Sequence, residues 1–181
     1  MKVETTDLPG VLVIEPVVHR DHRGFFLETW RAERYAAAGL PTSFVQDNHS
    51  RSARGTLRGL HYQVNQVQGK LMRCATGEIF DVAVDLRRGS PTYGRWASVT
   101  LSDRDHRQLW IPPGFAHGFY VLSEVADVEY KCTATYDPAD ERVIRWDDPD
   151  LAIAWPLDGR APVVSPRDAG GLAFRDAPAC G

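Results

Sequence analysis

Short apolar segments separated by turn residues are the main pattern of this chain. They lie at residues 11–14, 24–28, 57–62, 71–75, 79–86, 96–101, 108–111, 118–122 and 125–133. Most of the intervals between them are too short for a helix, and glycine and proline mark several breaks, as in RGSP at 88–91 and PPG at 112–114. Short strands punctuated in this way are typical of an antiparallel sandwich or barrel. The pattern therefore predicts an all-β fold.

Two segments are expected to be helical. Residues 31–38 have a helical pattern, with Thr29 available as N-cap and Gly39 as a C-terminal stop. A second short helical turn is expected after Asp147-Asp148-Pro149, because proline is tolerated early in a helix. We therefore expect only a few short helices at the periphery of the strands.

The composition fits one folded domain in a reducing compartment. With 181 residues, of which 43% are hydrophobic, the chain is long enough to bury one core and short for two. No internal repeat or linker interrupts it, so we expect a single domain spanning residues 1–181. Cys74, Cys132 and Cys180 are odd in number and far apart, which predicts neither a disulfide framework nor a cysteine zinc site.

The first residues, MKVETTDLPG, include two acidic side chains and lack the apolar core of a signal peptide. No stretch of the chain approaches the roughly 18 apolar residues of a membrane span. These features predict a cytoplasmic protein that makes no contact with a membrane.

The two-residue period of a strand assigns side chains to faces. In residues 125–135 most odd positions are charged or polar, whereas Tyr130 shares the even positions with apolar residues, so Tyr130 is expected to point inward. A buried tyrosine is more often a packing residue than a catalyst. Asp81 and Asp85 alternate with apolar residues, and they either face solvent or line a polar cavity.

Residues 48–70, NHSRSARGTLRGLHYQVNQVQGK, concentrate cations and amide side chains around His61. Between Asn48 and Gly77 there are five cations and no acidic residue, so this segment carries +5 and the remainder −8 of a formal net charge of −3. A local positive potential attracts phosphate whatever the overall sign. The segment therefore predicts a site for an anionic ligand. A sequence pI near 6.1 argues against a nucleic-acid partner.

His61 is the candidate general base of this segment. An imidazole with a pKa near ~6.5 can accept a proton at working pH if a carboxylate or carbonyl holds its tautomer. Metal binding is not expected, because neither a His-x-His pair nor a nearby glutamate accompanies His61. From the residues alone, a structural histidine is the more common interpretation. Nucleotide cofactors are not expected either, since GxGxxG and Walker motifs are absent.

His117 and Arg58 add to this candidate site. His117, in PPGFAHGF, is expected at a tight turn where the backbone can approach a ligand, although a histidine bonded to the turn's own backbone is nearly as common. Arg58 and His61 would lie on opposite faces of a regular strand. A site that contains both requires a bend or bulge, which Gly55 or Gly59 can supply.

Seven blocks in sequence resemble the dTDP-4-dehydrorhamnose 3,5-epimerase family. They are DHRGFFLETW, FVQDNHSRSARGTLRGLHYQ, QGKLMR, IFDVAVDLRRGSPTYGRW, LWIPPGFAHGFYVLS, VEYKCTATYDP and SPRDAGG. The resemblance covers almost the whole chain. It implies a cupin-type jelly roll, that is, a double-stranded β-helix, which forms a homodimer and inverts carbons 3 and 5 of a dTDP-4-keto-6-deoxy sugar without a cofactor.

The resemblance also implies roles for individual residues. His61 would be the base, oriented by Asp168, and Tyr130 the acid on the opposite side of the sugar ring. Lys70, helped by Arg58, would stabilise an enolate. The nucleotide would be held by Arg23, Phe26, Glu28, Gln46, Asn48, His117 and Tyr136, some of which reach the site from the neighbouring subunit. Arg167 departs from the lysine that is common in the family, but it keeps the charge.

Alternatives remain open at this point. The close one is a relative that inverts a single carbon in another deoxysugar pathway, and it could keep every residue named above. A ketoisomerase of the same fold is less compatible with Tyr130. A non-catalytic carbohydrate-binding jelly roll would have no use for a base, an acid and a cation in one place, a combination that marks active sites. The preference for thymine over uracil and the pathway's end product do not follow from the sequence.

Overall fold

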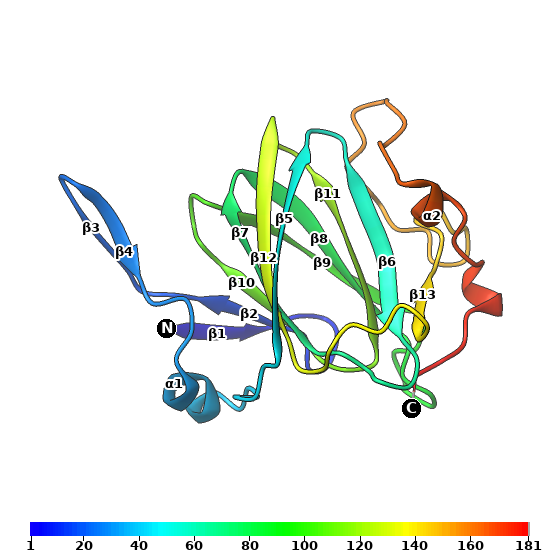
Figure 1. The fold of residues 1–181 in the computed structure, drawn as a ribbon, viewed down its shortest axis with the longest axis horizontal. Coiled ribbons are helices and arrows are strands. Elements are labelled where there is room, and N and C mark those ends of the chain that lie inside the picture. Colours follow the sequence, from blue (N-terminus) through cyan, green and yellow to red (C-terminus); the bar gives the residue numbers. More distant parts are fainter. Residues whose placement is uncertain (181) are drawn as a thin grey trace.

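Two antiparallel sheets packed face to face make up the computed structural model, which describes residues 1–180 (Figure 1). The first sheet has the order β1 (Lys2–Thr5), β2 (Leu12–Glu15), β10 (Gln108–Ile111), β7 (Lys70–Thr76), β12 (Val125–Cys132) and β5 (Gln46–Ala53). The second has the order β13 (Glu141–Val143), β6 (Leu57–Gln63), β11 (Phe115–Val121), β8 (Glu78–Asp85) and β9 (Trp96–Ser102). The predicted all-β fold is confirmed.

Successive strands alternate between the two sheets from β5 to β8 and again from β9 to β13. Because side chains alternate along each strand, every strand contributes about half of its residues to the space between the sheets. This space holds the main apolar core, to which Tyr130 packs from the inner face as parity predicted. Its buried members include Met72, Cys74, Ile79, Ala83, Leu101, Phe119, Val121 and Val128.

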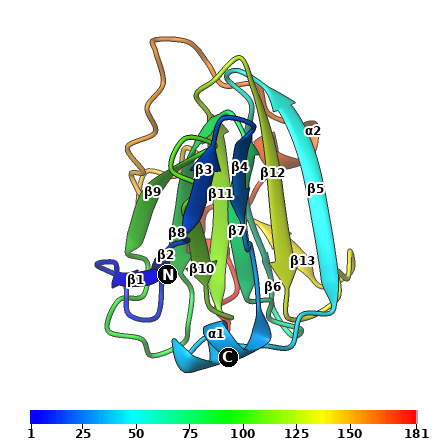
Figure 2. The same ribbon diagram turned by 90° about the vertical axis from the view of Figure 1, so that its left-hand side faces the viewer.

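A hairpin and three short helices lie outside the sandwich. The hairpin, β3 (Val18–Asp21) and β4 (Gly24–Leu27), projects from the body of the molecule beside the first sheet (Figures 1 and 2). The helices are α1 (Ala32–Ala37), α2 (Pro166–Ala169) and the 3-10 helix η1 (Phe174–Asp176). These few peripheral helices agree with the low helix content expected from the sequence.

One helix prediction is confirmed, and the other corresponds to a single turn. α1 confirms the helix expected at 31–38, but its N-cap is Arg31 and not Thr29, and no side chain caps it. After Asp147-Asp148-Pro149 the Ala152 amide donates to the Asp148 carbonyl at 2.9 Å, which closes one turn that does not continue as a helix. The Asp148 carboxylate also accepts hydrogen bonds from the amides of Asp150 and Leu151 in this turn.

A bulge separates His61 from Arg58 along β6. His117 pairs with His61 and Phe119 with Arg58, so β6 has three residue steps where β11 has two. The two strands approach closely at this point, since a Cβ atom at Gly59 would lie 2.6 Å from the Gly118 Cα. The φ of Gly59 is 120°, a conformation that side chains disfavour. The bulge predicted near Gly59 is therefore confirmed.

We expect Gly118→Ala to destabilise the protein, because the added Cβ would lie 2.7 Å from the Arg58 carbonyl oxygen. Overpacking of this kind costs about 1–3 kcal/mol of unfolding free energy, which urea denaturation would measure. Gly170→Ala is the matched control, since its Cβ would meet nothing closer than 3.4 Å. Equal stability of the two variants would show that β6 and β11 can separate at little cost.

Candidate active site

Polar side chains replace apolar ones on the inner faces of four neighbouring strands. Lys70 precedes the buried Met72 by two residues on β7, and Tyr130 and Cys132 follow Val128 on β12. On the opposite sheet, Asp81 lies two residues from Ile79 on β8, and His117 lies two residues from Phe119 on β11, so each polar residue shares a face with a core residue. The strand registers bring these positions together, because Cys132 is the partner of Lys70 and Tyr130 is the partner of Met72. The sandwich is thus apolar at one end and polar at the other.

His61 and Asp168 form a hydrogen-bonded pair, with 2.6 Å between Nε2 and Oδ1. The β6 strand supplies His61, and α2 supplies Asp168, whose amide donates to the Ser165 hydroxyl that caps this short helix. Burial acts to raise the pKa of Asp168, but the hydrogen bonds from His61 and from the Gly59 amide outweigh it and lower the pKa. Because an ionised Asp168 can only accept, His61 donates this hydrogen bond through an Nε2 that carries a proton.

A second histidine–carboxylate pair lies deeper in the interior. His117 Nε2 is 2.9 and 3.0 Å from the two oxygens of Asp81, and both residues are buried. Burial lowers the pKa of His117, and although Asp81 opposes this, Lys70 and His61 lower it further. The sequence had left Asp81 undecided between solvent and a cavity, and the structure places it in the interior. The expectation of a tight turn at His117 was wrong, because the turn ends at Gly114 and His117 lies within β11.

Lys70 is a buried cation on the same inner surface, with 8% of its area exposed. None of the ion pairs found within residues 1–180 includes its ammonium group. Burial lowers the pKa of Lys70, while the Cys132 thiol and the Asp81 carboxylate act in the opposite direction. A buried cation without a salt bridge is available to an anionic group that binds between the sheets.

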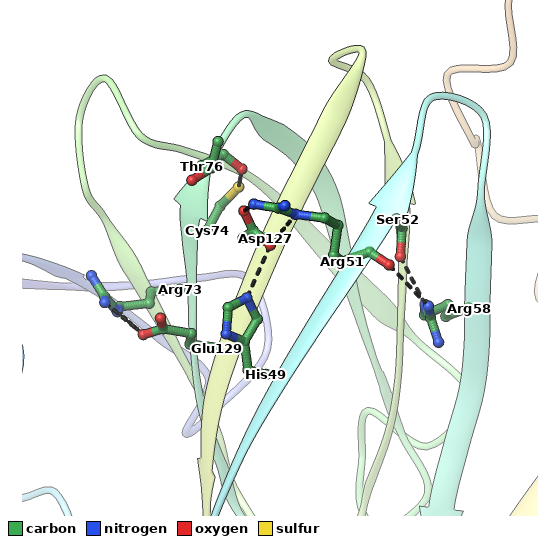
Figure 3. A network of polar contacts seen from close by, with 9 residues as sticks. All are labelled: His49, Arg51, Ser52, Arg58, Arg73, Cys74, Thr76, Asp127 and Glu129. Carbon is green, nitrogen blue, oxygen red and sulfur yellow. Dashed lines mark hydrogen bonds and ion pairs between the residues drawn. The ribbon is translucent and has the colours of Figure 1, made fainter.

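Tyr130 of β12 and Arg58 of β6 lie on the side of the sandwich where β5 and β6 face each other. Burial raises the pKa of Tyr130, and the Arg58 charge counteracts part of this effect. Arg58 Nε donates to the Ser52 hydroxyl at 3.0 Å, which holds the guanidinium between the two strands (Figure 3). The bulge in β6 therefore brings Arg58 to the same region as Tyr130, as the sequence required for a shared site.

Amide and aromatic side chains extend this surface toward the loop after β12. Gln46 Nε2 donates to Asn48 Oδ1 at 2.9 Å, and Gln46 Oε1 accepts from the Tyr136 backbone amide at 2.8 Å. The Tyr136 hydroxyl donates to Glu141 at 2.9 Å and accepts from Arg167 at 3.3 Å. Glu141, like Asp81, was not singled out as a site residue, and its only signal was its position a few residues after the VEYKCTATYDP block.

Three of the expected nucleotide-binding residues lie elsewhere in this chain. Arg23 at the tip of the hairpin pairs with Asp21, and Glu28 pairs with Arg31 and Arg34. Phe26 is 71% exposed on the hairpin. The structure thus brings together the residues expected from the body of the chain, and it does not bring the hairpin residues to His61.

The outer face of the first sheet carries a different polar network (Figure 3). Asp127 accepts hydrogen bonds from Arg51 and contacts His49 Nε2 at 2.9 Å, and Arg73 donates to Glu129. A pocket of about 410 Å³ opens on this face. Tyr130 and Asn48 contribute to its lining, but most lining residues lie outside the candidate site, and neither His61 nor Lys70 is among them, so this pocket is not the candidate active site.

A family model described as dTDP-4-dehydrorhamnose 3,5-epimerase matches residues 5–176. The chain belongs to this family. A dTDP-4-dehydrorhamnose 3,5-epimerase of Pseudomonas aeruginosa is 57% identical over 178 residues, which cover 98% of each chain. The sequence resemblance to the dTDP-4-dehydrorhamnose 3,5-epimerase family is thereby confirmed.

Solved structures agree with this assignment. The crystal structure of a dTDP-6-deoxy-D-glucose-3,5-epimerase from Legionella pneumophila, in complex with dTDP-4-keto-L-rhamnose, matches with a TM-score of 0.93 at 52% identity, covering 96% of this chain and 93% of that chain. NovW, a 4-keto-6-deoxy sugar epimerase from the novobiocin cluster of Streptomyces spheroides, matches with a TM-score of 0.92 at 40% identity, covering 97% and 88%. The fold of this epimerase-family chain is therefore a cupin-type jelly roll.

Within residues 1–180, no group of three or more histidine, cysteine or carboxylate side chains is arranged to hold a metal ion. None of the helices in that range has the length and apolar character needed to cross a bilayer.

We expect Lys70→Ala to lower kcat by about 10²-fold or more, because a preplaced cation acts on charge that develops during the reaction. Arg58→Ala should instead raise KM by about 10-fold, since it removes a charged contact to the bound anion. Lys131→Ala is the matched control, because Lys131 lies on β12 and pairs with Asp47 on the outside. Steady-state kinetics on a dTDP-4-keto-6-deoxy sugar would measure both constants, and unchanged kinetics in both site variants would contradict this assignment of the cations.

Proposed function

We propose that this protein inverts carbons 3 and 5 of dTDP-4-dehydro-6-deoxy-D-glucose to give dTDP-4-dehydro-L-rhamnose, a step of dTDP-L-rhamnose biosynthesis. One observation carries the proposal: a histidine paired with a carboxylate, a tyrosine and a buried lysine share one inner surface of the sandwich. Membership of the epimerase family supports the same reaction. No step of the proposed reaction calls for a cofactor or a metal ion.

The proposed chemistry begins with His61. The ketone at carbon 4 acidifies the protons on carbons 3 and 5, so a neutral imidazole can remove them one at a time. Asp168 accepts from Nε2 of His61, which leaves the lone pair on Nδ1 to take the substrate proton. Asp168 also stabilises the imidazolium that forms. His61 is thus the general base, and Asp168 acts through it.

Lys70 and Tyr130 would complete each inversion. Loss of the proton moves negative charge onto the oxygen at carbon 4, where the Lys70 ammonium stabilises the enolate. Tyr130 then delivers a proton to the opposite side of the ring, which inverts the carbon. Burial raises the pKa of Tyr130, which keeps the phenol protonated and able to donate.

The nucleotide would occupy the surface that runs from Arg58 toward Tyr136. Arg58 suits the diphosphate, because a guanidinium binds phosphate oxygens with two parallel N–H donors. Gln46 and Asn48 offer amide groups, His117 a buried imidazole, and Tyr136 an aromatic ring that is 45% exposed. We propose that Tyr136 packs on the thymine base.

We further propose that the active form is a homodimer in which each hairpin completes the neighbour's site. The support is geometric: Arg23 and Phe26 lie on a hairpin that projects from the side of the body opposite to β6, the strand that carries His61 of the same chain (Figure 1). Phe25 and Phe26 are 53% and 71% exposed, which is unusual for phenylalanine in a lone protein. A second copy of the chain would cover them.

A cytoplasmic location also remains a proposal. Cys74, Cys132 and Cys180 are all free thiols in the structure. Free, buried thiols agree with a reducing compartment, where disulfides are rare.

A second candidate is inversion of one carbon only, as part of another deoxysugar pathway. The similarity to NovW, which belongs to the novobiocin cluster, is the observation that favours it. The same base, acid and cation serve either outcome, so the two functions differ in how the sugar is placed between His61 and Tyr130.

Deuterium incorporation tests the proposed function. In deuterated water, the wild-type protein should incorporate deuterium at carbons 3 and 5 of dTDP-4-dehydro-6-deoxy-D-glucose, as proton NMR of the sugar would show. Deuterium at one carbon only would favour the second candidate.

His61→Ala should lower the rates of both deuterium exchange and product formation by about 10² to 10⁴. Tyr130→Phe should keep exchange but lose inversion, because only the acid is removed. Equal loss of both in Tyr130→Phe would contradict the assignment of the two residues to opposite sides of the ring.

Complementation between subunits tests the homodimer. Co-expressed Arg23→Ala and His61→Ala chains form hybrids in which one of the two sites has both residues intact, so activity should recover to about a quarter of wild type. The control pair is Lys70→Ala with His61→Ala, which regenerates no intact site because both residues come from one chain. If the Arg23→Ala pair shows only the summed activity of its parents, the hairpin does not serve a neighbouring site.

A further inference from the structure

The β3–β4 hairpin has two faces with different surroundings. Residues that pair across the strands point to the same side, so Arg20 and Phe25 share one face, and His19 and Phe26 share the other. The first face turns toward the loop between β9 and β10, where Arg20 donates to the Arg104 carbonyl oxygen at 3.1 Å. A contact that fixes the Arg20–Phe25 face therefore also fixes the direction in which Phe26 projects.

His106 makes that contact. Its ring centroid lies 4.4 Å from that of Phe25, with 40° between the ring planes. Arg20 also lies over the Phe25 ring, with its guanidinium carbon 5.7 Å from the ring centroid. The aromatic ring of Phe25 thus contacts both a cation of its own hairpin and an imidazole of the body.

The state of His106 fits a packing contact better than a polar role. The residue is 4% exposed, and its Nε2 is buried without a hydrogen-bond partner within residues 1–180. Its φ of 57° places the backbone in the left-handed region, and its amide donates to the Ser102 carbonyl at 3.0 Å. Burial and the nearby Arg20 lower the pKa of His106, although Asp103 and Asp105 oppose this. A neutral ring held in an unusual conformation against Phe25 is the result.

We propose that His106 is a positioning residue for nucleotide binding, because its contact with Phe25 fixes the hairpin that presents Arg23 and Phe26. This inference rests on the proposed function, in which those two side chains bind the dTDP group. His106 does not touch the reacting atoms, so its effect falls on binding of the nucleotide and not on proton transfer.

Kinetics of two variants test the proposal. His106→Asn removes the ring and keeps a residue that tolerates the left-handed conformation, and Phe25→Leu removes the other ring. Each should raise KM for the dTDP-sugar by about 2- to 10-fold, the range expected from loss of one aromatic contact, with kcat within about twofold of wild type. Tyr93→Leu is the control, because it removes a surface ring pair with Phe174 at 5.4 Å that lies away from the hairpin.

Limited trypsin digestion supplies a readout that does not depend on activity. The hairpin contains Arg20 and Arg23, and Arg160 lies in an exposed loop elsewhere. Release of the hairpin should speed cleavage after Arg20 or Arg23 in the His106 and Phe25 variants without changing cleavage after Arg160. The proposal is overturned if KM and hairpin cleavage stay at wild-type values, if kcat falls while KM is constant, or if cleavage accelerates equally at Arg160. If the wild type proved inactive on the dTDP-sugar but the variants still showed faster hairpin cleavage, the proposed function would be refuted, while the role of the His106–Phe25 contact in fixing the hairpin would be supported.

Discussion

The close approach of β6 and β11 is the constraint on which the candidate site depends. Gly59 and Gly118 lie so near each other that neither strand has room there for a side chain on that side. The extra residue of β6 at this point changes the parity of the strand. His61 consequently lies opposite His117, while Arg58 turns toward Ser52 on β5. A regular strand would have placed the base and the cation on different faces of the sheet.

The interior beyond this bulge holds charges that a purely structural core would avoid. Lys70, Asp81 and His117 are all buried; Asp81 acts to raise the pKa of both Lys70 and His117, and Lys70 acts to lower the pKa of His117. Burying unpaired charge is costly, and well-packed apolar residues would serve stability at least as well. The three groups compensate one another in part, because Asp81 accepts from His117 and favours the charged form of Lys70. Such a local conflict with stability is expected where a protein binds or transforms a ligand.

The sequence predicted what depends on local periodicity and on motifs. The strand rhythm gave the fold class, parity placed Tyr130 inside, and the need for a bulge followed from Arg58 and His61 alone. It could not decide Asp81, because alternation tells which residues share a face and not whether that face meets solvent or another sheet. It misjudged His117 for a similar reason: Gly118 looked like part of a turn, but it serves the approach of two strands. The hairpin's distance from His61 is a matter of tertiary packing, which no local pattern encodes.

The alternation of successive strands between the two sheets has a consequence for how the protein folds. Neighbours in space are remote in sequence, as in the pair formed by His61 and Asp168, which are 107 residues apart. Such non-local pairings slow folding, because the entropy cost of closing a long loop arises before the stabilising contacts between its ends can form. A nascent or truncated chain that stops before Asp168 therefore lacks the carboxylate that orients the histidine. The reactive geometry appears only when α2 has docked against β6, so competence for chemistry arises late in folding.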